Sequence, residues 1–81
     1  MFNNRTQDGR NNIAGVKVAS LRKGMKISQR EVADRLQLIG LDIDKNAVQR
    51  IESGQRFVTD IELISLAKVF SVTIEDLLNR D

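Results

Sequence analysis

Four polar side chains between residues 45 and 50 have the chemistry to read the edges of DNA bases. Lys45, Asn46, Gln49 and Arg50 stand at i, i+1, i+4 and i+5, so that they share one face if this stretch is helical. Their ammonium, amide and guanidinium groups match the donors and acceptors that base pairs display in the major groove. The stripe predicts direct base contacts, although an ordinary solvated helix face can have the same composition.

The element that must position this stripe is a short amphipathic helix, predicted over residues 44–53. Its opposite face is apolar and consists of Ala47, Val48 and Ile51. Asp44 is a favourable N-cap, and Gly54 stands where many helices end in a left-handed residue. The rest of the chain is expected to hold this helix with its polar face outward.

The composition excludes most other kinds of function. The 81 residues suffice for one small domain, and they include no Cys, His, Pro, Trp or Tyr. Disulfides, thiolate metal sites and a histidine base are therefore excluded. We expect no enzyme activity and no cofactor, metal ion or small-molecule ligand. No apolar run approaches the roughly 20 residues of a membrane span, and a cytoplasmic location is expected.

The charged residues are unevenly distributed along the chain. Residues 1–58 carry eleven Lys or Arg against six Asp or Glu, a net +5, and residues 59–81 carry two against five, a net −3. This asymmetry indicates a basic working end and an acidic far end. Scattered surface charge would produce the same count, so it supports DNA binding only weakly.

The remaining chain has the pattern of four further helices and no strand. The first is predicted from Asn12 to Lys23 or Gly24, with Gly24 as its stop. Three others should begin with capping boxes, which pair a hydroxyl N-cap with an acid three residues later; the boxes are Ser28–Glu31, Thr59–Glu62 and Thr73–Asp76. An all-α bundle follows, with residues 1–11, Phe2 included, as a flexible N-terminal arm and residues 12–81 as the domain. Arg5 and Arg10 keep a second interpretation open, in which the arm enters a minor groove of DNA.

Several large apolar residues are expected to fill the core of this bundle. Met25, Phe57 and Phe70 are interpreted as core residues rather than ligand contacts, and Ile39 could extend the inner face of the second helix. In the connector at residues 40–43, Leu41 and Ile43 alternate with polar residues and should pack back onto the core.

Two short motifs give the chain a resemblance to a known family. Ser28-Gln29 is followed by Ala33, and Ile51-Glu52 is followed by Gly54. With further matches, these motifs make residues 13–78 resemble the Cro and phage-repressor-like helix-turn-helix family, also called the xenobiotic-response-element (XRE) type. The further matches are Gly15, Leu21, Arg22, Val32, Val48, Leu66, Ala67, Val72, Leu77 and Leu78. The resemblance implies a compact five-helix bundle of the lambda-repressor-like DNA-binding type.

The resemblance also assigns roles to individual residues. It makes the 44–53 helix the recognition helix, with base contacts from Lys45, Asn46, Gln49 and Arg50. It places contacts to DNA phosphates at the start of the second helix and in the loop after the recognition helix; these residues are Ser28, Gln29, Arg30, Ser53, Gln55 and Arg56. Gln29 could instead support the base-reading side chains. Arg22 and Glu52 match a partly buried ion pair between the first and third helices.

The connection between the second and third helices departs from the family pattern. The interval from Ala33 to Glu52 is longer than the common family spacing, and the additional residues fall within residues 37–43. Two geometries remain open: a second helix that runs one turn longer, or a connector that bulges outward. The angle between the two helices depends on which is formed.

Two hypotheses for function follow. The first is a sequence-specific transcriptional regulator that binds double-stranded operator DNA, with repression the favoured mode. It is expected to bind as a homodimer whose two copies contact each other through the region from Phe70 to Leu78. The second is a protein-interaction module, such as an antitoxin-like subunit. Its sign would be an exposed apolar patch in the lengthened turn, drawn from Leu38, Ile39, Leu41 and Ile43. DNA binding should weaken steeply with salt, whereas an apolar protein contact should not.

Overall fold

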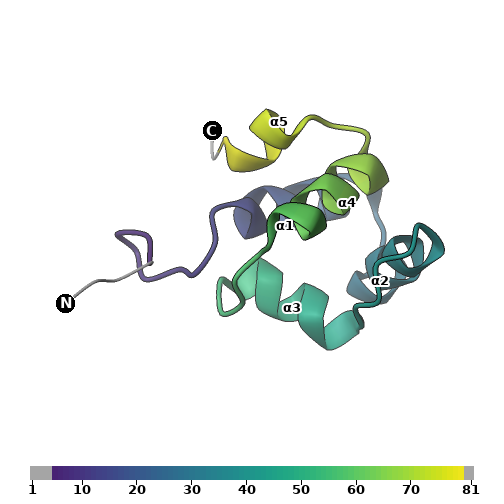
Figure 1. Cartoon of the computed structure of the whole chain (residues 1–81), viewed down its shortest axis with the longest axis horizontal. Helices are drawn as coiled ribbons and strands as arrows, with labels where there is room; N and C mark the ends of the chain where they lie inside the picture. The colour runs from purple at the N-terminus through teal and green to yellow at the C-terminus, as the bar shows by residue number, and fades with distance from the viewer. Residues whose placement is uncertain (1–4, 80–81) are drawn as a thin grey trace.

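All regular structure in the described part of the chain is helical. The computed structural model describes residues 5–79, so the remainder of the predicted arm (residues 1–4, Phe2 included) and the last two residues of the predicted domain lie outside it. Within residues 5–79 there are five helices and no strand, which confirms the predicted all-α class (Figure 1). The helices are α1 (Ala14–Met25), α2 (Gln29–Leu38), α3 (Lys45–Ser53), α4 (Asp60–Phe70) and α5 (Ile74–Leu78).

Helix α1 is the centre of the bundle. It packs against α3, α4 and α5, while α2 packs against α3 and α4. In Figure 1, α3 lies along the lower side of the molecule and α5 along the upper side, with α1 and α4 between them. This arrangement leaves one side of α3 without a covering helix. None of the helices within residues 5–79 is both long and apolar enough to cross a bilayer.

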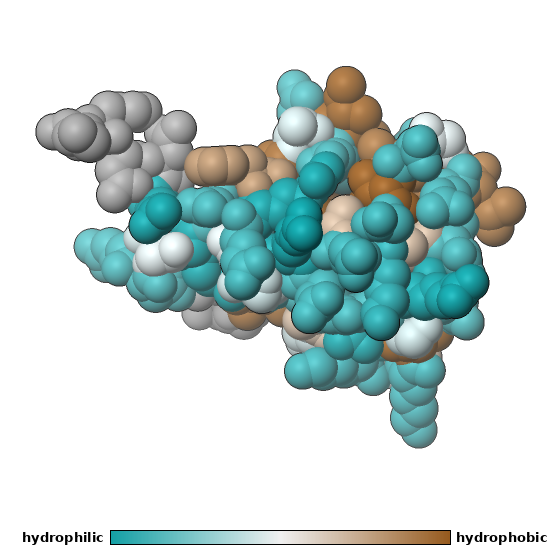
Figure 2. All heavy atoms as spheres, turned by 90° about the horizontal axis from the view of Figure 1, so that it is seen from below, coloured by the Kyte–Doolittle hydropathy of each residue, from teal (hydrophilic) through white to brown (hydrophobic). Residues whose placement is uncertain are grey.

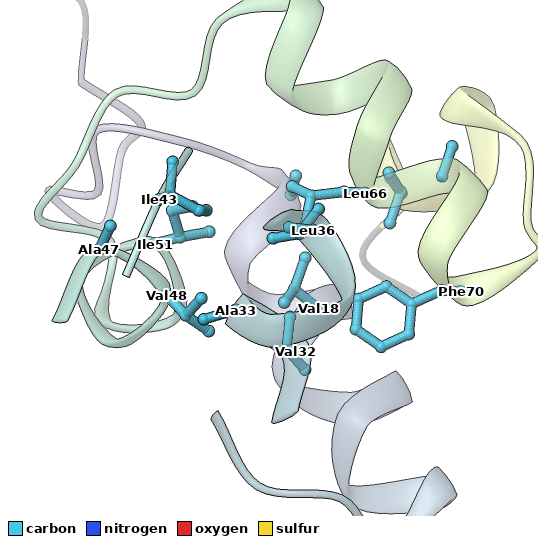
Figure 3. Close-up of a cluster of buried hydrophobic side chains, with 13 residues drawn as sticks. Val18, Val32, Ala33, Leu36, Ile43, Ala47, Val48, Ile51, Leu66 and Phe70 are labelled. Atoms are coloured by element: carbon cyan, nitrogen blue, oxygen red, sulfur yellow. The ribbon is translucent and has the colours of Figure 1, made fainter. Parts of the chain in front are cut away.

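The hydrophobic core lies where the inner faces of α1, α2, α3 and α4 meet (Figure 3). Its buried apolar residues are Ala14, Val18, Val32, Ala33, Leu36, Ile43, Ala47, Val48, Ile51, Leu66, Ala67, Phe70 and Leu77. The helical spacing of these residues along the sequence is what places them on common faces. The buried face of α3 is therefore the apolar face that its sequence predicts.

Three of the expected core residues lie at the surface instead. Met25, the last residue of α1, is 41% exposed. Phe57 is 57% exposed in the loop between α3 and α4, and Ile39 is 48% exposed just past the end of α2. Of Met25, Phe57 and Phe70, only Phe70 is buried in the core. The apolar character of the exposed residues alone did not predict this exposure, because each of them lies at the end of a helix or in a loop.

Side-chain caps determine where the helices begin. The Asp44 carboxylate accepts from the Ala47 amide at 2.8 Å, and complete capping boxes start α4 at Thr59 and α5 at Thr73. The third predicted box is incomplete. The Ser28 hydroxyl accepts from the Glu31 amide at 3.0 Å, but the Glu31 carboxylate pairs with Arg35 one turn later instead of returning to the N-cap.

The first helix differs from its predicted limits at both ends. It begins at Ala14 rather than Asn12, whose side-chain amide is directed to the carbonyls of Ile51 and Arg56. It continues through Gly24 to Met25. Lys26, with φ of 60°, takes the left-handed position that Gly24 was expected to provide, and its amide bonds to the last turn of the helix.

The lengthened turn folds back on itself rather than extending α2. The helix ends at Leu38, and Gly40 adopts a φ of +95° that lets the chain reverse. The Leu41 amide then bonds to the Leu36 carbonyl at 3.0 Å, and the Gln37 side chain donates to the Ile43 carbonyl at 2.9 Å. Ile43 is buried and Leu41 packs against the core, as expected.

Leu36 and Leu38 provide a matched test of this packing, because they occupy one helix and differ only in burial. Leu36 is fully buried, whereas Leu38 is 86% exposed. We expect Leu36→Ala to lower the free energy of unfolding by about 2–5 kcal/mol and Leu38→Ala to change it by about 0.5 kcal/mol or less. Urea denaturation followed by circular dichroism measures both. Equal losses in the two variants would contradict this position of α2.

Candidate nucleic-acid interface

The outward face of α3 carries the four predicted base-contacting residues. Lys45, Asn46, Gln49 and Arg50 are all exposed. Figure 2 views the molecule from the side on which α3 lies, and the surface there is mainly hydrophilic. An uncovered polar helix face of this kind can enter a groove without first displacing part of the protein.

Two local features hold α3 in this orientation. Its apolar side packs against α1 and α2, with Val48 and Ile51 almost completely buried. Its C-terminal end is closed by Gly54, which has a φ of +83° and whose amide bonds to the carbonyls of Arg50 and Ile51. A residue with a Cβ would be strained there.

The Glu52 carboxylate, at the end of α3, is bonded to both α1 and α2. Its carboxylate accepts from Arg22 of α1 at 2.7 Å and 3.1 Å, and from the amide of Gln29 of α2 at 3.0 Å. Arg22 also donates to the Ile27 carbonyl at 3.0 Å, so that its guanidinium is held on two sides. The side chains of Arg22 and Glu52 are only 15% and 8% exposed.

The electrostatics of this group favour its charged form. The hydrogen bonds that Arg22 donates to the Glu52 carboxylate raise the pKa of Arg22 above its ordinary value, against the opposing effect of burial. The guanidinium therefore stays protonated. The Gln29 side chain donates to the same carboxylate, so it helps to hold Glu52 and with it the end of α3.

Hollows on the surface bring several predicted contact residues together. Asn46, Arg50 and Arg56 line one hollow with Asp42 and Asp44, so α3 and its following loop present polar groups to a common space. Lys45 and Arg30 line a second hollow between α2 and α3. Gln49 lines neither of these, although it is exposed on the same helix.

Some of the residues predicted to contact phosphates already form side-chain bonds within the protein, and others do not. Arg30 and Gln55 have exposed side chains. The hydroxyl groups of Ser28 and Ser53 are engaged in bonds within the protein, to the Glu31 amide and the Arg50 carbonyl. One terminal nitrogen of Arg56 pairs with the buried carboxylate of Glu62 at 2.6 Å. Arg56 is thus held in place near the hollow that it lines.

Three residues before α1 contact the end of α3 or the loop after it, which the sequence did not indicate. Arg10, Asn11 and Asn12 all form hydrogen bonds to the end of α3 or to the loop after it. The predicted boundary between arm and domain at residues 11 and 12 is not tested by these contacts, and it remains a prediction. The sequence predicted Asn12 as a helix start and left Arg10 as a candidate for a DNA groove, but it did not predict these contacts, because a short polar run without a period is common in chain termini.

Residues 5–79 contain no group of three or more acidic side chains that could hold a metal ion.

Comparison with known proteins decides the family. A model described as helix-turn-helix matches residues 18–77, which is most of the chain. The protein belongs to the Cro/C1-type helix-turn-helix family. The resemblance found in the Ser28-Gln29 and Ile51-Glu52 motifs is confirmed.

Solved structures share the fold. The restriction-modification controller protein C.AhdI from Aeromonas hydrophila is 28% identical, with a TM-score of 0.68 over 79% of this chain and 89% of its own. The P22 c2 repressor, solved with a synthetic operator, is 20% identical, with a TM-score of 0.72 over 86% of this chain and 98% of its own. A search among curated proteins gave no significant match.

Membership of this family makes the protein a DNA-binding transcriptional regulator. Its family and structural neighbours are regulators of this kind rather than enzymes. In this fold α2 and α3 form the helix-turn-helix unit, and α3 is the helix that the unit presents to DNA.

Removal of the Glu52 carboxylate should destabilise the domain, because Arg22 would be left partly buried without its partner. We expect Glu52→Ala to cost about 3 kcal/mol of unfolding free energy. Glu31→Ala is the matched control, since Glu31 pairs with Arg35 at the surface, where such pairs contribute about 0.2–1 kcal/mol. Thermal unfolding followed by circular dichroism compares the two. An unchanged midpoint for Glu52→Ala would contradict the role assigned to this group.

Proposed function

We propose that the protein recognises one specific operator sequence in double-stranded DNA and represses transcription when it occupies that site. The observation that carries the proposal is the exposed polar face of α3, on a helix whose other face is fixed in the core. Because the operator lies in the genome, we infer that the protein works in the cytoplasm.

Base readout is assigned to the side chains on this face. Lys45 and Arg50 have the donors that suit the guanine O6 and N7 acceptors, and Asn46 and Gln49 can bond bidentately to adenine. Asn46 and Arg50 line one hollow with Arg56, so a base edge and a phosphate could be contacted from the same place. Asp42 and Asp44 line the same hollow, and their carboxylates suit a cytosine amino group.

Phosphate contacts are assigned to the two ends of the helix-turn-helix unit. Arg30 and the α2 N-terminus would meet the backbone on one side of α3, and Gln55 and Arg56 on the other. Ser28, Gln29 and Ser53 would contribute from the same two places, although their side-chain bonds within the protein make them secondary candidates. The net +5 of residues 1–58 supports this assignment.

A homodimer is the assembly that we assign to the operator complex. The proposed contact surface lies in the region from Phe70 to Leu78, where Ile74 and Leu78 are 38% and 43% exposed although both are apolar. Phe70 and Leu77 are buried in the core and would not take part directly. This surface lies on the side of the molecule opposite α3 in Figure 1, which leaves the reading face free.

Selection from a random library of duplex DNA at about physiological salt tests the proposed function. A specific protein of this class should bind its operator roughly 10³-fold or more above unrelated DNA, and a two-fold axis should appear in the enriched motif. Half-sites should be separated by about one helical turn, roughly 34 Å. An asymmetric motif would contradict the homodimer, and the absence of any enrichment would contradict specific DNA recognition.

Arg50→Ala tests the assignment of an individual base contact. Loss of the guanidinium should weaken binding by about 1–3 kcal/mol and relax the preference at one base position of the selected motif. Lys68→Ala, which removes one exposed charge from α4, is the control and should leave the motif unchanged. A uniform loss across all sequences would instead assign Arg50 to a phosphate.

A protein-interaction module remains the second candidate, favoured by one observation. Leu38 is 86% and Ile39 48% exposed at the lengthened turn. The patch is smaller than expected, because Ile43 is buried and Leu41 packs against the core. Binding to a partner protein that survives high salt and is lost in Leu38→Ala would favour this candidate. DNA recognition, in contrast, is weakened steeply by salt.

A further inference from the structure

Three consecutive residues before α1 fasten the C-terminal end of the recognition helix. Arg10 Nη2 donates to the Glu52 carbonyl at 2.8 Å and to the Ile51 carbonyl at 3.3 Å. Asn12 Nδ2 donates to the same Ile51 carbonyl at 3.1 Å. The last carbonyls of a helix have no partner within the helix. Residues 10–12, which we call the N-terminal strap, therefore supply a partner for the Glu52 carbonyl and add donors to the Ile51 carbonyl, which also accepts from the Gly54 amide.

The strap also holds the loop that follows α3. The Asn11 amide donates to the Gly54 carbonyl at 2.7 Å, and its side chain donates to the Gln55 carbonyl at 2.9 Å. Asn12 Nδ2 reaches the Arg56 carbonyl at 2.7 Å. Gln55 and Arg56 are the residues assigned to phosphate contact after α3. The strap therefore holds both the end of α3 and the loop that follows it, which are the two neighbouring parts of the proposed DNA-binding surface.

Two glycines make room for the Arg10 side chain. A methyl group at Gly15 would lie 2.6 Å from Arg10 Nη2 and 1.9 Å from the Ile51 carbonyl oxygen. A methyl group at Gly54 would lie 2.8 Å from Arg10 Cζ. The guanidinium thus fits a space that α1 and the end of α3 leave open together.

The charge of Arg10 suits this position. The C-terminal end of a helix carries partial negative charge on its unpaired carbonyls, and a guanidinium there is favourable. Its Nε also donates weakly to the Asn12 carbonyl at 3.4 Å, and its own amide donates to the Thr6 hydroxyl at 2.9 Å. Nε and Nη2 of the guanidinium are thus directed to carbonyls of the protein.

We propose that Arg10 is a positioning residue for DNA recognition. Through the strap it holds the end of α3 and residues 54–56 in the orientation that operator binding requires, without touching DNA. The effect on operator affinity rests on the proposed function, whereas the fastening of α3 does not.

Amide hydrogen exchange tests the fastening without DNA. Gly54, Gln55 and Arg56 donate their amides to carbonyls in the last turn of α3. In Arg10→Ala these amides should exchange at least about tenfold faster, while the amide of Leu36 in the core keeps its protection. Unchanged exchange at residues 54–56 would overturn the proposal. If Arg10→Ala does not fold, Arg10→Met, which keeps an unbranched side chain but has no hydrogen-bond donor, should accelerate exchange at the same amides and decides the question instead.

Binding to the selected operator and to a scrambled duplex over a salt series tests the consequence for recognition. Arg10→Ala should lose about tenfold in operator affinity and clearly less on the scrambled duplex, because base readout needs α3 in one orientation whereas the phosphate contacts of residues 55 and 56 are less demanding. Lys68→Ala removes one charge on α4 and should alter neither affinity.

Other results would overturn the positioning role. Equal losses on both duplexes with a salt slope reduced by about one would mean that Arg10 contacts a phosphate. If Arg10→Ala lowers the thermal midpoint but binds the operator with full affinity at temperatures below that midpoint, Arg10 only stabilises the folded domain. If the wild-type protein does not distinguish the duplexes, the proposed function fails, and hydrogen exchange still decides whether the strap fastens α3.

Discussion

The structure depends on one carboxylate, that of Glu52, which receives hydrogen bonds from two other helices. Arg22 binds it from α1 and Gln29 binds it from α2, so the position of α3 is defined relative to both. An apolar contact alone would allow α3 to slide or rotate, because dispersion contacts have little directionality. Directed bonds to a partly buried carboxylate restrict that freedom, which a helix that reads bases requires.

The same requirement applies to the other parts of α3. Asp44 closes its N-terminal end with a side-chain cap, and Gly54 together with the N-terminal strap closes its C-terminal end. A helix of 9 residues is too short to be stable by itself. Its stability therefore comes from its ends and its buried face, and the outward face is left free to carry residues chosen for DNA.

The lengthened turn shows how the family fold accommodates an insertion. Gly40 reverses the chain, and the bonds of Leu41 and Gln37 close the turn on itself, so that α2 ends at Leu38 without an extra turn of helix. Ile43 reaches the core and fixes the start of α3. The lengthened turn leaves Leu38 and Ile39 exposed at the surface.

Local patterns along the chain determined the helices, the buried face of α3 and the family, because helical spacing and N-caps act between residues only a few positions apart. They failed at Met25 and Phe57, since exposure at a helix end or in a loop depends on which neighbours are absent. Only the tertiary structure decided that Gln29 supports Glu52 and that Arg10 caps α3. These contacts join residues 23 and 42 positions apart. Which of many polar side chains meets a given carbonyl is set by the packing of helices, and no short-range pattern contains that information.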